Sequence, residues 1–162
     1  MQQRIINRVE RDPHYKTYLQ AFDPGNDGTA AAAIIGAAKQ IARTVKAKCM
    51  VVFTAGGTTA QRASKNRPDV PILAISPLKE TARQLSMSWG VYSEFSDADK
   101  IDTDDFRSML RDACSMAKKK GLVDDDNDLL VVTAGFPFGT PGAANIVRVV
   151  PAAGPSHWDS SL

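Results

Sequence analysis

Apolar and polar positions along the chain follow two periods, one typical of helices and one typical of buried strands. Apolar residues three or four apart predict amphipathic helices over residues 29–46 and 103–120. Shorter helices are expected near residues 1–10, 60–65 and 78–86, with a turn at Asp23–Asn26. Continuous apolar runs predict five strands, at Met50–Phe53, Ile72–Ile75, Val91–Phe95, Leu129–Thr133 and Ile146–Val150.

This order of elements predicts the fold class. Strands that alternate with helices and have no polar face belong to a largely parallel sheet covered on both sides. We expect an α/β fold of three layers, α-β-α, with a five-stranded, mostly parallel sheet and an antiparallel last strand. One domain is expected over residues 1–152, followed by a tail at 153–162 that is either disordered or docked through Trp158.

Composition excludes several classes of partner. The chain has 162 residues, 43% hydrophobic and 23% charged, and a net charge of +2, so nothing favours nucleic acid or an anionic membrane. No apolar run approaches the roughly 20 residues of a membrane span, and the N-terminus lacks the apolar stretch of a signal peptide. We therefore expect a cytoplasmic protein, in which Cys49 and Cys114 are buried, reduced thiols.

Two glycine-rich loops follow predicted strands, where ligands gather in parallel sheets. The first loop is Thr54, Ala55, Gly56, Gly57, Thr58, Thr59. Its backbone N–H groups suit a phosphate at the N-terminus of the next helix, but glycine also serves a plain strand-to-helix corner, and the pattern supports both interpretations equally. The second loop, TAGFPFGTPGAAN at residues 133–145, suits the other side of a bound phosphate or a hairpin turn between two strands.

No catalytic or metal-binding motif is evident. The acidic run Asp124–Asp128 fails as a calcium loop because Leu129 and Gly135 stand where glycine and glutamate are required, so a solvated turn is expected there. His14 and His157 have no ligand partners at metal spacing, and no Ser-His-Asp arrangement appears. We expect neither catalytic residues nor a cofactor in this chain.

The segments VVFTAGGTTAQRASKNRPDVPILAISPLKETARQLSMSWGVY and DLLVVTAGFPFGTPGAANIVRVV resemble the C-terminal domain of pyruvate kinase. The opening RIINRVERDP is similar to the helix that precedes this domain, and RVV matches its final strand. The TAG-x-P-x-G pattern is more similar to the bacterial enzymes than to the animal ones.

The resemblance implies a regulatory role. Pyruvate kinase transfers the phosphoryl group of phosphoenolpyruvate to ADP, using Mg²⁺ and often K⁺, in a catalytic barrel with a lid domain. A barrel alone needs about 250 residues, so this chain is expected to be inactive alone. Its implied partners are the barrel and lid of the same enzyme, the other subunits of a homotetramer, and a phosphorylated effector bound by the first loop. The alternatives are a stand-alone anion- or nucleotide-binding domain and a pure subunit-interaction module.

The chain also departs from the family pattern. Relatives that sense fructose 1,6-bisphosphate carry a tryptophan and an arginine after the third strand; here Arg107 fits the arginine, or faces solvent, and SDADKIDTDDF has no tryptophan. Many bacterial members have Gly-Thr-Thr-Asn where this chain has Gly142-Ala143-Ala144-Asn145. We therefore expect a sugar monophosphate or a nucleotide such as AMP, or loss of effector binding. Further candidate effector contacts from the second loop are Gly139, Thr140, Gly142 and Asn145.

Overall fold

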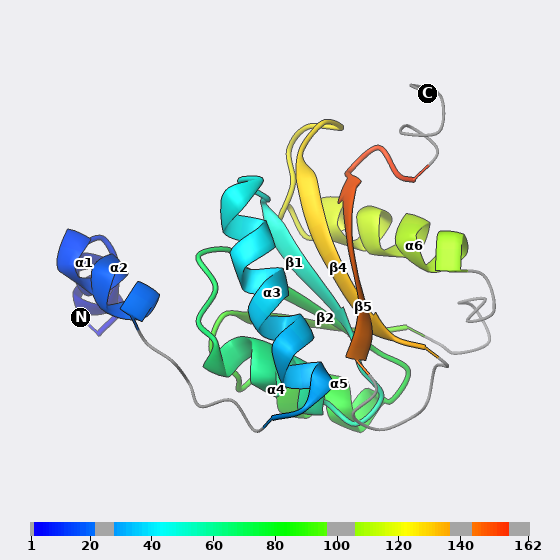
Figure 1. Ribbon diagram of the computed structural model, residues 1–162, viewed down its shortest axis with the longest axis horizontal. Helices are drawn as coiled ribbons and strands as arrows, with labels where there is room; N and C mark the ends of the chain where they lie inside the picture. The colour runs from blue at the N-terminus through cyan, green and yellow to red at the C-terminus, as the bar shows by residue number, and fades with distance from the viewer. Residues whose placement is uncertain (1, 22–27, 97–105, 137–143, 156–162) are drawn as a thin grey trace.

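A computed structural model describes residues 2–21, 28–96, 106–136 and 144–155. Within them, five strands form one sheet, with helices on both faces (Figure 1). The strands are β1 (Cys49–Phe53), β2 (Ile72–Ser76), β3 (Val91–Phe95), β4 (Leu129–Gly135) and β5 (Ala144–Pro151). The helices are α1 (Gln2–Glu10), α2 (Pro13–Ala21), α3 (Ala30–Thr44), α4 (Thr58–Lys65), α5 (Lys79–Leu85) and α6 (Phe106–Lys119).

The sheet has the order β3-β2-β1-β4-β5. Strands β1 to β4 are parallel, with Met50 opposite Ile72 in β2 and opposite Val131 in β4. Only β5 is antiparallel, and it pairs with β4 from Leu129↔Pro151 to Gly135↔Ala144. The predicted sheet, including its antiparallel last strand, is confirmed.

Alternate residues of each strand enter two different cores. Cys49, Val51 and Phe53 of β1 pack with the buried face of α6. Met50 and Val52, which point to the other side, pack with residues of α3, α4 and α5. Because both faces are covered, the central strands are apolar throughout, and the three-layer α-β-α prediction is confirmed.

Local signals explain where several helices begin and end. The Oγ1 of Thr29 accepts a hydrogen bond from the N–H of Ala32 at 3.2 Å, so Thr29 caps α3. The lysines at the end of α6 precede Gly121, whose φ of 65° ends the helix in the left-handed conformation. Asp12 caps α2, accepting a hydrogen bond from the N–H of His14 at 2.8 Å, ahead of Pro13 at the first helical position.

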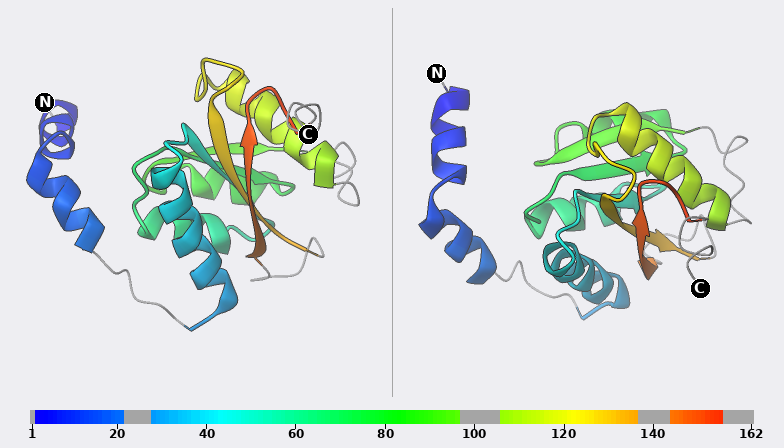
Figure 2. Two further views of the ribbon diagram at one scale, coloured as in Figure 1. Left: turned by 45° about the horizontal axis from the view of Figure 1, so that its top comes forward. Right: turned by 90° about the horizontal axis from the view of Figure 1, so that it is seen from above.

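Helices α1 and α2 stand beside the sheet unit rather than on it, as Figures 1 and 2 both show. The sequence predicted α1 but not α2. Most of the expected tail at 153–162 lies outside the described residues, so the boundary at residue 152 stays a prediction. Among the described helices, none has the length and apolar character needed to cross a membrane.

Candidate functional site: the glycine corner after strand β1

Strands β1 and β4 are parallel neighbours, so their carboxyl ends lie at the same edge of the sheet. From β1 the chain proceeds through α4 to β2 on one side, whereas β4 lies on the other side of β1. This is the topological switch point of the sheet, where open α/β folds bind ligands. Both glycine-rich loops begin there, one after Phe53 and one after Gly135. The strand ends thus meet as the parallel-sheet prediction requires.

The first loop is closed by a hydrogen bond within itself. The Oγ1 of Thr54 accepts from the N–H of Gly57 at 3.0 Å, and both residues are buried. Gly57 has a φ of 84°, which L-residues rarely adopt, and a Cβ placed on it would lie 3.2 Å from the Cγ2 of Thr81 on α5. Gly57 is therefore required by the corner itself, and its N–H group is engaged inside the loop rather than available to a ligand.

Gly56 lies in a different environment. It is exposed, its φ is outside the left-handed region, and a Cβ placed on it would meet nothing within 4 Å. Neither backbone strain nor a neighbouring side chain requires glycine at this position. Close approach of a ligand to the backbone is one physical reason for a glycine in open space.

Helix α4 starts directly after the corner. The first intrahelical bond of α4 runs from the N–H of Gln61 to the carbonyl of Gly57, at 3.0 Å. The N–H groups of the first turn, including those of Thr58 and Thr59, therefore have no acceptor within the helix. Thr58 is exposed, whereas Thr59 is buried with 7% of its surface accessible. The loop thus offers two main-chain donors and the Thr58 hydroxyl at the positive end of a helix dipole.

Ser76, at the end of β2, was missed by sequence reasoning. Its side chain is fully buried; Oγ donates to the carbonyl of Ala55 at 3.2 Å and accepts from the N–H of Leu78 at 3.2 Å. It thereby ties the glycine corner to the start of α5. The only sequence signal was a serine directly after an apolar strand, in ILAIS followed by proline.

The second loop is described only at its two ends. Strands β4 and β5 form a hairpin, and the side chain of Asn145 bridges it: Oδ1 accepts from the N–H of Phe136 at 2.9 Å, and Nδ2 donates to the carbonyl of Phe136 at 2.6 Å. Asn145 is thus engaged in closing the hairpin. Gly139, Thr140 and Gly142 lie outside the described residues, so their candidate roles stay predictions.

Arg107 is exposed in the first turn of α6, which covers the face of the sheet opposite α4. As an effector contact, Arg107 would therefore reach the ligand from the helical layer on the face of the sheet opposite α4. That role stays a prediction.

The two cysteines are unreactive in character. Both are free and buried, as expected. Burial raises the pKa of the Cys49 thiol to about 12, outweighing the opposite effect of a backbone hydrogen bond with Leu73. Burial likewise raises the pKa of Cys114 to about 11, against a smaller lowering by Lys118. Neither thiol has the lowered pKa of a nucleophile.

The acidic run before β4 forms a turn. The Oδ2 of Asp128 accepts hydrogen bonds from the N–H groups of Asp124 at 2.9 Å and Asp125 at 3.0 Å. Bonds from Asp125 and Asp124 hold the pKa of Asp128 below its ordinary value. In the described part of the chain, no three His, Cys, Asp or Glu side chains gather as a metal site would need.

The comparison with known families is decisive. The family described as "Pyruvate kinase, alpha/beta domain" matches residues 32–150. The chain belongs to this pyruvate kinase α/β domain family. It is 40% identical over 149 residues to a pyruvate kinase of Agrobacterium vitis, covering 92% of this chain and 30% of that protein. It is 36% identical over 147 residues to a pyruvate kinase of Methylorubrum extorquens, again covering 30% of that protein.

Solved structures agree with this assignment. The Cryptosporidium parvum pyruvate kinase in complex with ADP matches with a TM-score of 0.67 and 26% identity, over 79% of this chain and 25% of that one. The resemblance of the sequence segments to the C-terminal domain of pyruvate kinase is confirmed. The chain spans about a third or less of the length of these pyruvate kinases.

Proposed function

We propose that the chain is the regulatory and assembly domain of a cytoplasmic pyruvate kinase, and that residues 54–59 bind the phosphate of a small effector. The observation that carries the proposal is the exposed Gly56, which no neighbour requires, next to the first turn of α4, whose N–H groups have no intrahelical acceptor and no side-chain cap from Gly57. These donors and the helix dipole favour a compact anion. The catalytic barrel and lid, with their Mg²⁺ and K⁺, belong to a part of the enzyme that 162 residues cannot contain.

A ligand with one phosphate fits this loop better than a bisphosphate. On the described side of the second loop, Ala144 is buried and has no hydroxyl, and both polar atoms of the Asn145 side chain bond to Phe136. A second phosphate would thus find few side-chain donors at the end of β5. We favour a sugar monophosphate or a nucleotide such as AMP as the effector.

Calorimetric titration of the chain with sugar monophosphates and AMP tests this proposal. Saturable binding that Thr58→Ala combined with Thr59→Ala weakens about tenfold or more is expected, since each charge-assisted hydrogen bond to phosphate is strong. Gln61→Ala, an exposed change in the same helix, is the matched control and should bind normally. In the assembled enzyme, the double variant should shift the activation curve and leave maximal turnover nearly intact. If the curve is unchanged for every effector, these residues do not form the site.

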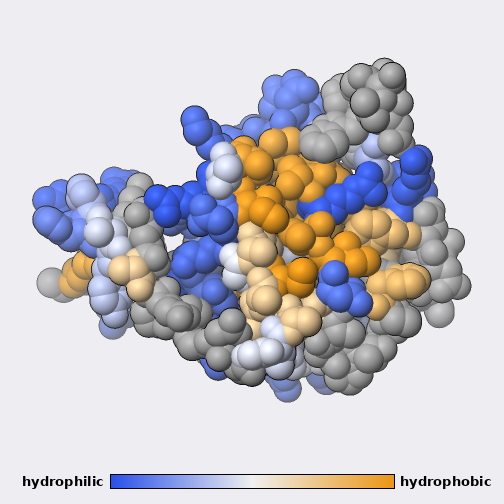
Figure 3. Space-filling view, viewed as in Figure 1, coloured by the Kyte–Doolittle hydropathy of each residue, from blue (hydrophilic) through white to orange (hydrophobic). Residues whose placement is uncertain are grey.

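The second part of the proposal, subunit assembly, depends on the α3/β5 face. We define it by the half-buried apolar residues Ile41, Val45, Leu129, Val147 and Val149. Figure 3 shows apolar surface gathered over this side of the molecule, where α3 and β5 lie in Figure 1. Strand β5 is also an edge of the sheet, next to β4 alone. An apolar face beside an open strand edge is typical of a subunit interface.

Sedimentation velocity tests the assembly role. Val147→Lys places a charge in the α3/β5 face and should shift the chain toward monomer, because a desolvated unpaired charge is costly. Tyr92→Lys, on the opposite edge strand β3, is the matched control because Tyr92 is 50% exposed. Both variants must first show unchanged urea unfolding. Equal association of the two variants would remove the α3/β5 face from the interface.

A further inference from the structure

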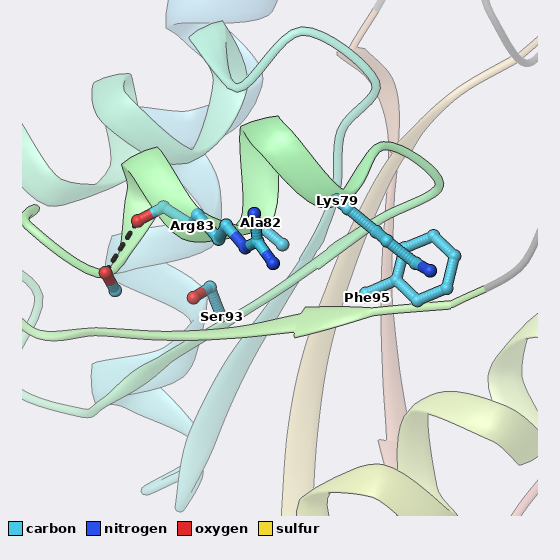
Figure 4. A pocket seen from close by; sticks show the side chains of 6 residues that line it. Lys79, Ala82, Arg83, Ser93 and Phe95 are labelled. Carbon is cyan, nitrogen blue, oxygen red and sulfur yellow. Dashed lines mark hydrogen bonds between the residues drawn. The ribbon is translucent and has the colours of Figure 1, made fainter.

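A surface hollow of about 350 Å³ lies between helix α5 and the edge strand β3, and none of residues 54–59 lines it. Lys79, Ala82, Arg83 and Ser86 line it from α5 and its end, and Ser93 and Phe95 line it from β3. Figure 4 shows Lys79 and Arg83 extending from α5 on the side that faces β3. The volume is that of a small-molecule site rather than of a single bound ion.

The two charged residues that line the hollow are both positive. Lys79 and Arg83 are four residues apart in α5, so both cationic side chains leave the same face of the helix toward the hollow. Neither forms an ion pair within the described part of the chain. Glu94, the acid in β3 between Ser93 and Phe95, instead pairs with Lys120 from the other side of the sheet. Among the described residues that line the hollow, the only charges are therefore these two positive ones.

The remaining lining groups add a donor and an aromatic surface. Ser93 is half-buried, and its hydroxyl has no hydrogen-bond partner among the described residues. Ser86 already donates to the carbonyl of Arg83 at 2.6 Å, which leaves its oxygen as an acceptor. The ring of Phe95 lies 5.1 Å from the Nζ of Lys79 and remains 37% exposed. A hollow lined by an aromatic ring and by two cationic side chains suits a ligand with a flat apolar part and an anionic head.

We propose that this hollow is a second binding site, independent of residues 54–59, for a small molecule that carries an oxyanion on a flat apolar body. Arg83 and Lys79 hold the oxyanion, the Ser93 hydroxyl donates to it, and the apolar body rests against Phe95. Phosphate esters and carboxylates share this chemistry. The site does not depend on the effector function proposed for the glycine corner.

Amide chemical-shift mapping of the full 162-residue chain tests the site, with phenyl phosphate, benzoate and inorganic phosphate as probes at physiological salt. Saturable shifts are expected in residues 79–86 and 91–95, with tighter binding of one or both aromatic probes than of inorganic phosphate. The preferred probe identifies the anionic head as phosphate or carboxylate. Arg83→Gln and Lys79→Gln should each weaken binding about tenfold, and Phe95→Ala should remove the advantage of the aromatic probes.

Two controls separate this site from diffuse charge and from the glycine corner. Lys65→Gln removes an exposed cation of α4 and should leave the affinity unchanged. Thr58→Ala combined with Thr59→Ala should also leave binding in the hollow unchanged, even if it abolishes binding at residues 54–59. Shifts confined to residues 54–59, non-saturating shifts, or equal losses in Arg83→Gln and Lys65→Gln would overturn the proposal. So would binding of a glutamate-rich peptide but of none of the three small anions.

Discussion

Replacing Gly57 with alanine tests why the chain has two adjacent glycines after β1. The φ of Gly57 is 84°, and a left-handed conformation costs an alanine about 1–2 kcal/mol. The added Cβ would lie 3.2 Å from Thr81 Cγ2 and 3.5 Å from Leu85 Cδ2, which adds about 1 kcal/mol of crowding in a packed region. Alanine also lowers the conformational entropy of the unfolded chain, which offsets about 0.4–1 kcal/mol of this destabilisation. The net destabilisation expected is about 2 kcal/mol.

Urea unfolding followed by circular dichroism measures this loss. With a typical slope of about 1–3 kcal/mol/M for a domain of this size, the midpoint should fall by about 1 M at unchanged slope. The neighbouring Gly56→Ala is the matched control: its Cβ meets nothing within 4 Å, so the variant should be as stable as the parent or up to about 1 kcal/mol more stable. Equal stabilities for the two variants, or a stable Gly57→Ala, would refute this account of the corner.

Three further predictions concern groups outside the corner. The lowered pKa of Asp128 contributes stability that is present above about pH 4, the ordinary value for the unfolded chain, and is lost as pH falls through the folded value. Asp128→Asn should therefore lower the urea midpoint at pH 7, and this difference should vanish in acid; a difference independent of pH would contradict the role of charge. Cys49 and Cys114 should resist a thiol reagent at pH 8 in the folded chain, because thiols with pKa values of about 12 and 11 are almost fully protonated at that pH. Both should react in urea, where burial no longer raises these pKa values. Rapid labelling without urea would show that either thiol is accessible. Asn145→Ala should cost about 1–2 kcal/mol in urea unfolding by removing both bonds to Phe136, and an unchanged midpoint would show that they are not formed in solution.

Strands β1 and β2 were predictable because residues 49–53 and 72–75 are continuous apolar runs, as expected where both faces of the sheet are covered. Edge strand β3 carries a weaker signal, because its sequence VYSEF includes Ser93 and Glu94 and none of its residues is fully buried. Helix α2 was missed because its nine residues, PHYKTYLQA, have only a weak apolar face. The Asp12-Pro13 pair, a cap followed by proline at the first helical position, was the available signal.

The candidate site was predictable in position but not in detail. The sequence placed the loop after β1, but the different roles of Gly56 and Gly57 depend on Thr81 and Leu85, which only the fold brings beside Gly57. The role of Ser76 likewise depends on the adjacency of β1 and β2. Such contacts join residues more than 20 positions apart, and no local pattern encodes them.

The proposed effector loop and the proposed subunit face are joined through two helices. The loop opens α4, and α4 packs on α3 through a core that includes Ala60 and Ala63 on one helix and Ala38 and Ala42 on the other. Alanine has no side-chain rotamers, so rotamer changes at these four positions cannot absorb a displacement of α4, which favours a shift of α3 with it. Since α3 carries Ile41 and Val45 of the α3/β5 face, binding at the loop and association of subunits are expected to be linked. Linkage is reciprocal: if an effector strengthens association tenfold per bound molecule, association must strengthen effector binding tenfold, a coupling of about 1.4 kcal/mol. An effector affinity independent of protein concentration across the association range would show that the two sites are not coupled.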